Sequence, residues 1–236
     1  MSDINVVDVF GQFSRPDNID ALGVYQEVCV QDTYGFRALH AAGFKVRTAV
    51  DLGASWGMAA RMIRHFWPAA RIVAFEPDPL RFAYLARNCP SVECRNYAVA
   101  GFATDRAKML AGIGLDNGPW RQNVDQAFSA SASGVPSYMT DPPASVASAF
   151  SGISDIDLLK IDVEGFELGI IREMKELGLL ANVRGIVGEW HFENARLGLA
   201  EDLAATHDAT FTMPVENAGP WQAFVAVLRK TEVLNA

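Results

Sequence analysis

Residues 49–57 read Ala-Val-Asp-Leu-Gly-Ala-Ser-Trp-Gly, an apolar run that ends in an acid and then breaks into small residues. The pattern predicts a buried strand, a tight turn and a helix N-terminus, whose backbone N–H groups face a ligand held close to the main chain. Gly53 lacks a Cβ, so it can take a positive φ and let a ligand approach. Ser55 is expected to cap the helix that follows. The stretch therefore predicts the first strand and the ligand-binding turn of an α/β domain.

A second apolar run, residues 71–75, ends at Glu76. An acid at the end of the second strand can accept hydrogen bonds from both hydroxyls of a ribose. A dinucleotide site with the pattern G-x-G-x-x-G would need three glycines here, but the chain has Gly53, Ser55 and Met58. The missing pyrophosphate cradle favours a nucleoside without phosphates, such as S-adenosylmethionine, over a nicotinamide cofactor.

Four segments of the chain together resemble the FkbM family of class I S-adenosylmethionine-dependent methyltransferases. They are Val50 to Gly57, Phe75 to Pro77, Asn96 to Ala98 and Leu158 to Glu167, and the run Lys-Ile-Asp-Val-Glu-Gly at 160–165 is the most specific part. The resemblance spans roughly residues 46–230. It implies an α/β, Rossmann-like fold, in which a mostly parallel seven-stranded sheet has an antiparallel last strand and helices on both faces.

The resemblance also implies which residues bind S-adenosylmethionine. These positions are Asp51, Gly53, Ser55, Glu76, Asn96, Ala98 and Asp162. Asp51 and Gly53 would lie against the methionine half of the cofactor, and Glu76 would hold the ribose hydroxyls. The backbone of residues 96–98 would lie near the adenine, and Asp162 would lie beside the reacting centre.

Methyl transfer to a hydroxyl needs a group that takes up the hydroxyl proton as the new bond forms. Four candidates follow predicted strands, namely Asp162, Glu164, Glu189 and His191. His191 is favoured because the unperturbed pKa of an imidazole is about 6.5. The three acids can also supply oxygen ligands to Mg²⁺. Their spacing matches no dedicated metal-ligand motif, so we expect no bound metal and a metal-independent transfer.

The composition fits one large globular α/β domain rather than a disordered chain. Of the 236 residues, 50% are apolar and 20% are charged, and a chain of this size can enclose a sizeable core. The formal net charge of -8 disfavours a nucleic-acid partner, because nonspecific affinity for phosphates comes from Lys and Arg. Three cysteines are an odd, sparse set that indicates reduced thiols.

No secretory signal opens the chain, and no apolar run approaches the roughly 20 residues that a membrane span requires. We therefore expect a cytoplasmic protein whose partner is a small-molecule acceptor, with no nucleic acid and no membrane span. The sequence leaves a homodimer open.

Residues 1–45 are expected to form an N-terminal cap of helix and strand, and residues 46–236 the methyltransferase domain. In the cap, Val24 to Val30 predicts a short strand. The domain carries an irregular insertion at 103–154, which is expected to choose the acceptor together with the first 40 residues. Trp120 and Tyr138 are the aromatic surfaces expected there. Further strands are predicted at residues 91–99, 156–162, 183–187, 210–213 and 224–228.

The predicted function is S-adenosylmethionine-dependent O-methylation of a hydroxyl on a sugar or small natural product. Two alternatives stay open, a non-catalytic S-adenosylmethionine or nucleoside-binding protein and a methyltransferase that acts on a nitrogen acceptor. Residues 141–144, Asp-Pro-Pro-Ala, are similar to a loop of methyltransferases that act on exocyclic amines of nucleic-acid bases, but they lack its aromatic residue.

Overall fold

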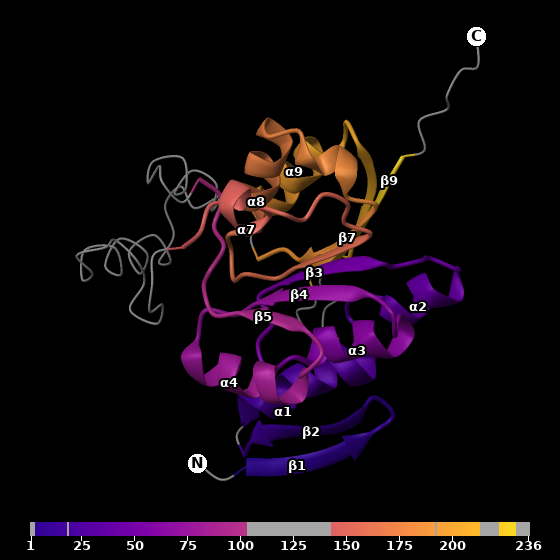
Figure 1. The fold of residues 1–236 in the computed structure, drawn as a ribbon. Coiled ribbons are helices and arrows are strands. Elements are labelled where there is room, and N and C mark those ends of the chain that lie inside the picture. Colours follow the sequence, from indigo (N-terminus) through magenta and orange to yellow (C-terminus); the bar gives the residue numbers. More distant parts are fainter. Residues whose placement is uncertain (1–2, 18, 103–142, 192, 213–221, 230–236) are drawn as a thin grey trace, which may run out of the picture.

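A β-sheet with helices on both faces organises the protein (Figure 1). The computed structural model describes residues 3–17, 19–102, 143–191, 193–212 and 222–229. Within these ranges the sheet has seven strands, which in chain order are β3 (Thr48–Leu52), β4 (Arg71–Phe75), β5 (Glu93–Arg95), β6 (Leu158–Ile161), β7 (Gly185–Glu189), β8 (His207–Phe211) and β9 (Ala223–Leu228). Their spatial order is β5-β4-β3-β6-β7-β9-β8.

All strands of this sheet run parallel except β9. Strand β3 pairs in parallel with β4 and β6, and β6 pairs in parallel with β7. β9 runs antiparallel between β7 and β8. This topology confirms the predicted Rossmann-like fold with its antiparallel last strand. The segments that follow β3, β4, β6 and β7 meet at one edge of the sheet, because these strands point the same way.

Two layers of helices cover the two faces of the sheet (Figure 1). One face carries α7 (Val146–Ala149), α8 (Glu167–Glu176) and α9 (Glu193–Leu203), and the other α1 (Ile19–Tyr25), α2 (Phe36–Ala41), α3 (Met58–Phe66) and α4 (Pro79–Asn88). In β3, Val50 and Leu52 belong to the core shared with α8, whereas Ala49 belongs to the core shared with α3. Burial on both faces explains why the apolar residues Ala49 and Val50 stand next to each other instead of alternating with polar ones.

Among the residues that the structure describes, no helix combines the length and the apolar character needed to cross a bilayer.

The short 3-10 helix η2 (Leu179–Asn182) joins α8 to β7.

Residues 24–30, which were expected to form a strand, are helical. α1 continues into a π-helical segment, η1 (Gln26–Gln31), which packs against α3. Val24 and Val28 lie four residues apart and both contact this core, as residues on one face of a helix do. A short run of apolar residues is compatible with the two-residue repeat of a strand and with the 3.6-residue repeat of a helix. Packing of this segment against α3 stabilises the helix.

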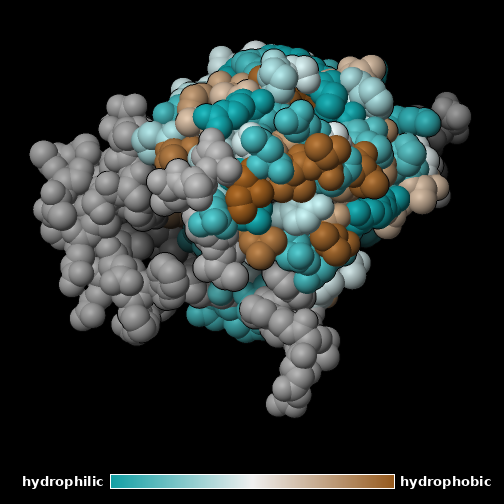
Figure 2. All heavy atoms as spheres, turned by 90° about the horizontal axis from the view of Figure 1, so that it is seen from below, coloured by the Kyte–Doolittle hydropathy of each residue, from teal (hydrophilic) through white to brown (hydrophobic). Residues whose placement is uncertain are grey.

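The strands β1 (Asp3–Asp8) and β2 (Gly11–Pro16) form a separate antiparallel hairpin. Arg61 of α3 anchors it, because Nη2 pairs with Oδ1 of Asp8 at 3.0 Å and donates a hydrogen bond to the Gly11 carbonyl at 2.7 Å. Figure 2 views the molecule from below, where hydrophobic side chains gather on the surface. Val7 and Val9 of this hairpin are largely exposed.

Ser55 lies in the turn after β3 and does not cap the helix that follows. α3 begins at Met58 after Gly57, which has a φ of 90°. Ser55 itself has a φ of 49°, and its N–H donates a hydrogen bond to Glu76. A Cβ at Gly57 would lie 2.9 Å from the Cys89 sulfur, so glycine is required at the start of the helix.

Residues 143–154 are folded, although they were expected to belong to an irregular insertion. Ala144 forms a backbone bridge with Val99, and α7 follows at once. The side chains of Val146, Ala149, Phe150 and Ile153 are buried in the core. The rest of the expected insertion, residues 103–142 with Trp120 and Tyr138, lies outside the described residues, and so do the first two residues of the 141–144 motif.

Candidate active site

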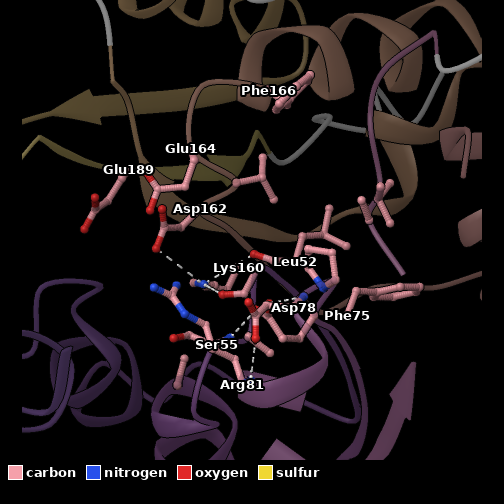
Figure 3. A pocket seen from close by; sticks show the side chains of 18 of the residues that line it. Leu52, Ser55, Phe75, Asp78, Arg81, Lys160, Asp162, Glu164, Phe166 and Glu189 are labelled. Carbon is pink, nitrogen blue, oxygen red and sulfur yellow. Dashed lines mark hydrogen bonds and ion pairs between the residues drawn. The ribbon is translucent and has the colours of Figure 1, made fainter. Parts of the chain in front are cut away.

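A cavity of about 410 Å³ opens at the edge where the parallel strands end (Figure 3). Its size is typical of small-molecule sites. The N-terminal cap contributes Glu27 and Tyr34 to its lining, and the turn after β3 contributes Gly53 and Ser55. The remaining lining residues that matter for the chemistry are Glu76, Ala98, Lys160, Asp162, Glu164 and Glu189.

Glu76 presents a fixed carboxylate to this cavity. Its Oε2 accepts the N–H of Ser55 and its Oε1 accepts the N–H of Asp78, each at 2.8 Å. The side chain is only 4% exposed; burial raises the pKa of Glu76, and the two backbone N–H groups oppose this shift. A carboxylate oxygen has two lone pairs, so each oxygen can accept one more hydrogen bond from a ligand.

Asn96 supports the turn that carries Glu76. Its Nδ2 donates hydrogen bonds to the carbonyl oxygens of Glu76 at 2.8 Å and Pro77 at 3.2 Å. The Asn96 side chain is not part of the cavity lining, whereas Ala98 is. Of the two positions assigned to the adenine side, Ala98 therefore faces the cavity and Asn96 holds the backbone behind it.

The backbone of Asp162 packs so closely against Gly53 that only a glycine fits at this position. It has a φ of 76°, and a Cβ at this position would lie 1.8 Å from the carbonyl oxygen of Asp162. The sequence explained Gly53 by the approach of a ligand. In the structure, the backbone of Asp162, after β6, lies so close to Gly53 that a side chain at this position would collide with it.

Asp51 and Lys160 form a buried ion pair beneath the turn. Asp51 Oδ1 lies 3.3 Å from Lys160 Nζ, and both side chains are almost fully buried. Nζ also donates a hydrogen bond to the Gly53 carbonyl at 2.6 Å. Burial lowers the pKa of Lys160, but the carboxylates of Asp51 and Asp162 outweigh it and raise that pKa. Asp51, which was expected against the methionine half, does not line the cavity and instead holds the lysine that fixes the turn.

Asp162 follows β6 and reaches the cavity as predicted. Its Oδ2 accepts a hydrogen bond from the Tyr34 hydroxyl at 2.7 Å and lies 3.6 Å from Lys160 Nζ. Burial, and then the Asp162 carboxylate, raise the pKa of Tyr34 well above its usual value of 10. The tyrosine therefore stays a hydrogen-bond donor to Asp162.

His191 lies among four acidic side chains. Its Nδ1 is 3.0 Å from Glu167 Oε1, and its Nε2 is 3.5 Å from Glu164 and 3.9 Å from both Asp162 and Glu189. Burial lowers the pKa of His191, but these carboxylates, led by Glu167, outweigh it and raise that pKa to about 9. This pKa lies above the unperturbed value of about 6.5 for which His191 was favoured as the base, and His191 is not among the residues that line the cavity.

Glu189 ends β7 and lines the cavity. Burial, followed by the neighbouring carboxyl groups of Glu27 and Asp162, raises the pKa of Glu189 to about 10. Burial and the two neighbouring carboxyl groups therefore favour the protonated form of Glu189 over the isolated anion.

The structure brings most of the predicted residues to one cavity. Those that line it are Gly53, Ser55, Glu76, Ala98, Asp162, Glu164 and Glu189. Asp51, Asn96 and His191 do not line it, but each interacts with a residue that does. The sequence did not indicate Glu27 and Tyr34, which come from the N-terminal cap. Neither stands in a motif, and only the packing of η1 and the following segment over the sheet edge brings them here.

Comparison with known proteins identifies the family. The profile of the Methyltransferase FkbM domain matches residues 51–215, whereas no curated protein matches the chain. Among solved structures, the METTL16 MTase domain is 10% identical with a TM-score of 0.51, covering 95% of this chain and 85% of that chain. The protein 1320 of Thermoplasma acidophilum is 16% identical with a TM-score of 0.46, covering 84% of each chain. An O-methyltransferase from Bacillus cereus in complex with SAH is 14% identical with a TM-score of 0.46, covering 85% of this chain and 81% of that chain.

Identities this low show the fold alone, so the family profile carries the assignment. The site agrees with the cofactor of such enzymes, because the Glu76 carboxylate is held by two backbone N–H groups and faces a cavity large enough for a nucleoside. The chain thus belongs to the FkbM methyltransferase family, and S-adenosylmethionine is its cofactor.

Proposed function

We propose that this protein transfers the methyl group of S-adenosylmethionine to a hydroxyl of a sugar or of another small polyhydroxylated molecule. The observation that carries the proposal is the acidic lining of one half of the cavity. Asp162, Glu164 and Glu189 lie together there, at the ends of β6 and β7, and the turn with Ser55 forms the other half (Figure 3). Carboxyl groups accept hydrogen bonds from hydroxyls, so this half suits an acceptor with several of them.

In this proposal, Glu76 accepts the hydrogen bonds of the ribose hydroxyls and the turn at Gly53 lies against the methionine half. When bound, the cofactor supplies an electrophilic methyl group on a sulfonium. The side chains of the chain then align the acceptor oxygen behind that methyl group and exclude water.

Glu164 is the side chain best placed to take up the hydroxyl proton. It lines the cavity with a side chain that is 74% exposed, so its carboxylate is free to move toward an acceptor. Asp162 is less suited, because the Tyr34 hydroxyl and Lys160 stabilise its anion. His191 is less suited because it is not among the residues that line the cavity.

Residues 1–45 act in this proposal as a cap that completes the acceptor half. Glu27 and Tyr34 line the cavity from this cap. The further choice of acceptor by residues 103–154 stays a prediction, because residues 103–142 lie outside the described part of the chain.

The acidic lining also suits a nitrogen acceptor, because an amine carries donors and positive charge that carboxylates attract. A screen with a radiolabelled methyl group on the cofactor, over sugars, polyols and amines, separates these two readings. Label that appears as a methyl ether on a hydroxyl supports the proposal, and label found only on amines contradicts the choice of acceptor. Absence of transfer to any acceptor would support a binding protein.

Glu164→Gln tests the role of the base once an acceptor is found. We expect kcat to fall by about 10²–10⁴-fold while the affinity for S-adenosylhomocysteine stays unchanged. Glu201→Gln, an exposed position on α9, is the matched control. A Glu164→Gln variant as active as this control would contradict the assignment.

A further inference from the structure

The geometry points to a divalent-cation site at the ends of β6 and β7, formed by Asp162, Glu189 and His191. One ligand atom from each of these residues lies within 4.8 Å of the others. Ligands that share one small divalent ion lie at most about 4–5 Å apart, because each lies about 2.0–2.6 Å from the metal. The three side chains can therefore close on one ion with small rotations.

The orientation of the histidine is a second and independent observation. Glu167 is fully buried, and its Oε1 accepts the N–H groups of Val163 at 2.9 Å and Gly165 at 3.1 Å. The same oxygen lies 3.0 Å from His191 Nδ1. A carboxylate behind one ring nitrogen fixes the ring and directs the other nitrogen outward, which is the usual support of a metal-binding histidine.

The space in front of Nε2 is the third observation. Oxygens of Asp162, Glu164 and Glu189 surround His191 Nε2 at 3.5–3.9 Å, which is too far for direct hydrogen bonds. Several carboxyl groups thus face one ring nitrogen, and an ion placed between them could bind to all of them.

Asp162 can serve this site without leaving its other partners. Tyr34 and Lys160 engage Oδ2, whereas Oδ1 is the oxygen closer to His191. The donor set is therefore one imidazole nitrogen with carboxylate oxygens. Such a mixed set suits Mn²⁺, Fe²⁺ or Zn²⁺ better than Ca²⁺, which prefers oxygen alone.

A cation here would act in the proposed function, on which this inference rests for its chemical role. Asp162 and Glu189 line the acceptor half of the cavity, so an ion between them could bind an acceptor hydroxyl and make it more acidic. Glu164, beside the site, would then take up the proton. The proposed site is an alternative to the metal-independent transfer that sequence spacing led us to expect, and that expectation stays a prediction.

Manganese binding to the full chain tests the site without any turnover. Chelator-treated protein is titrated with Mn²⁺ in the absence of S-adenosylmethionine, and bound ion is followed by electron paramagnetic resonance and water-proton relaxation. We expect one saturable site in the wild type. Glu189→Gln and His191→Gln should each weaken it at least tenfold, and Glu201→Gln should leave it unchanged.

The same samples also separate this inference from the proposed function. Binding of S-adenosylhomocysteine, measured by calorimetry, checks that each variant is folded and keeps its cofactor site. Absence of a saturable Mn²⁺ site in the wild type, or unchanged Mn²⁺ affinity in both variants, would overturn the cation site, whether or not the cofactor binds. Loss of cofactor binding with an intact Mn²⁺ site would instead count against the proposed function alone.

Discussion

The hydroxyl of Tyr34 donates a hydrogen bond of 2.7 Å to Oδ2 of Asp162, although the two residues are 128 positions apart in the sequence. Tyr34 belongs to the N-terminal cap, and Asp162 follows the central strand β6. The bond ties the cap to the edge of the sheet where the cavity lies. The Tyr34 side chain is buried and that of Asp162 is 22% exposed, so water competes for this bond only from the cavity side.

Replacing Tyr34 with phenylalanine removes this bond and keeps the ring. We expect the free energy of unfolding to fall by about 1.5–3 kcal/mol, as for a buried hydrogen bond to a charged group. Urea denaturation measures it. Tyr97→Phe is the control, because the Tyr97 hydroxyl accepts only a 3.4 Å contact from Arg95. If both variants lose the same free energy of unfolding, the hydrogen bond to Asp162 contributes no more than the weak contact of Tyr97.

Gly53→Ala and Gly178→Ala form a matched pair. Both glycines have a left-handed φ, 76° and 71°, but an added Cβ lies 1.8 Å from the Asp162 carbonyl at Gly53 and meets nothing within 4 Å at Gly178. Gly178→Ala should cost about 1–2 kcal/mol, the strain of the left-handed conformation. Gly53→Ala should cost clearly more or prevent folding, as thermal denaturation and soluble yield will show. Similar stabilities would mean that the segment after β6 can move away.

The Asp51–Lys160 pair should be stabilising only as a pair. Lys160→Met leaves the buried Asp51 carboxylate without its partner, so we expect a loss of about 3–5 kcal/mol. Adding Asp51→Asn should recover part of this loss in a double-mutant cycle. Lys175→Met removes the ion pair of a half-exposed lysine with Asp202, which keeps Arg172 as a partner, and should cost about 1 kcal/mol or less. No recovery in the double variant would contradict the coupling.

His207 should make stability depend on pH. It is buried on β8, with Nε2 2.9 Å from the Val183 carbonyl and Nδ1 2.8 Å from the Thr206 hydroxyl. Burial lowers the pKa of His207, so below the unfolded value of about 6.5 the unfolded state binds a proton that the folded state does not. Stability is therefore full above pH 6.5 and falls as the pH falls below it.

The measurement is the free energy of unfolding between pH 5 and 8 for the wild type and His207→Gln. The difference between the two curves should change by up to about 1.4 kcal/mol per pH unit below pH 6.5. His65→Gln, at an exposed position of α3, controls for the loss of an imidazole. A difference curve without slope would contradict the lowered pKa.

Much of the fold could be predicted because the ends of its elements carry local signals. Asp78 and Pro79 mark the start of α4, where the Asp78 carboxylate accepts the N–H groups of Leu80 and Arg81. The strand expected at 91–99 is shorter, only Glu93–Arg95, because the Asn96 side chain bonds to the turn after β4 and the chain leaves the edge of the sheet.

The candidate site could be predicted only in part. Glu76, Asp162 and Glu189 were found because each follows a strand, and parallel strands end at one edge. Tyr34 could not be found, because no local pattern indicates that its segment crosses the sheet edge. The raised pKa of His191 could not be predicted either, because it arises from Glu167 and other carboxylates that come together only in the fold.

Calorimetry of cofactor binding tests the central claim most directly. S-adenosylhomocysteine should bind the wild type at one site, NAD should bind more weakly or not at all, and Glu76→Ala should weaken S-adenosylhomocysteine binding by about 1.5–3 kcal/mol through the lost ribose contact. Glu93→Ala, an exposed acid on the neighbouring strand β5, should bind like the wild type. NAD binding as tight as that of S-adenosylhomocysteine, or unchanged affinity in Glu76→Ala, would contradict the account.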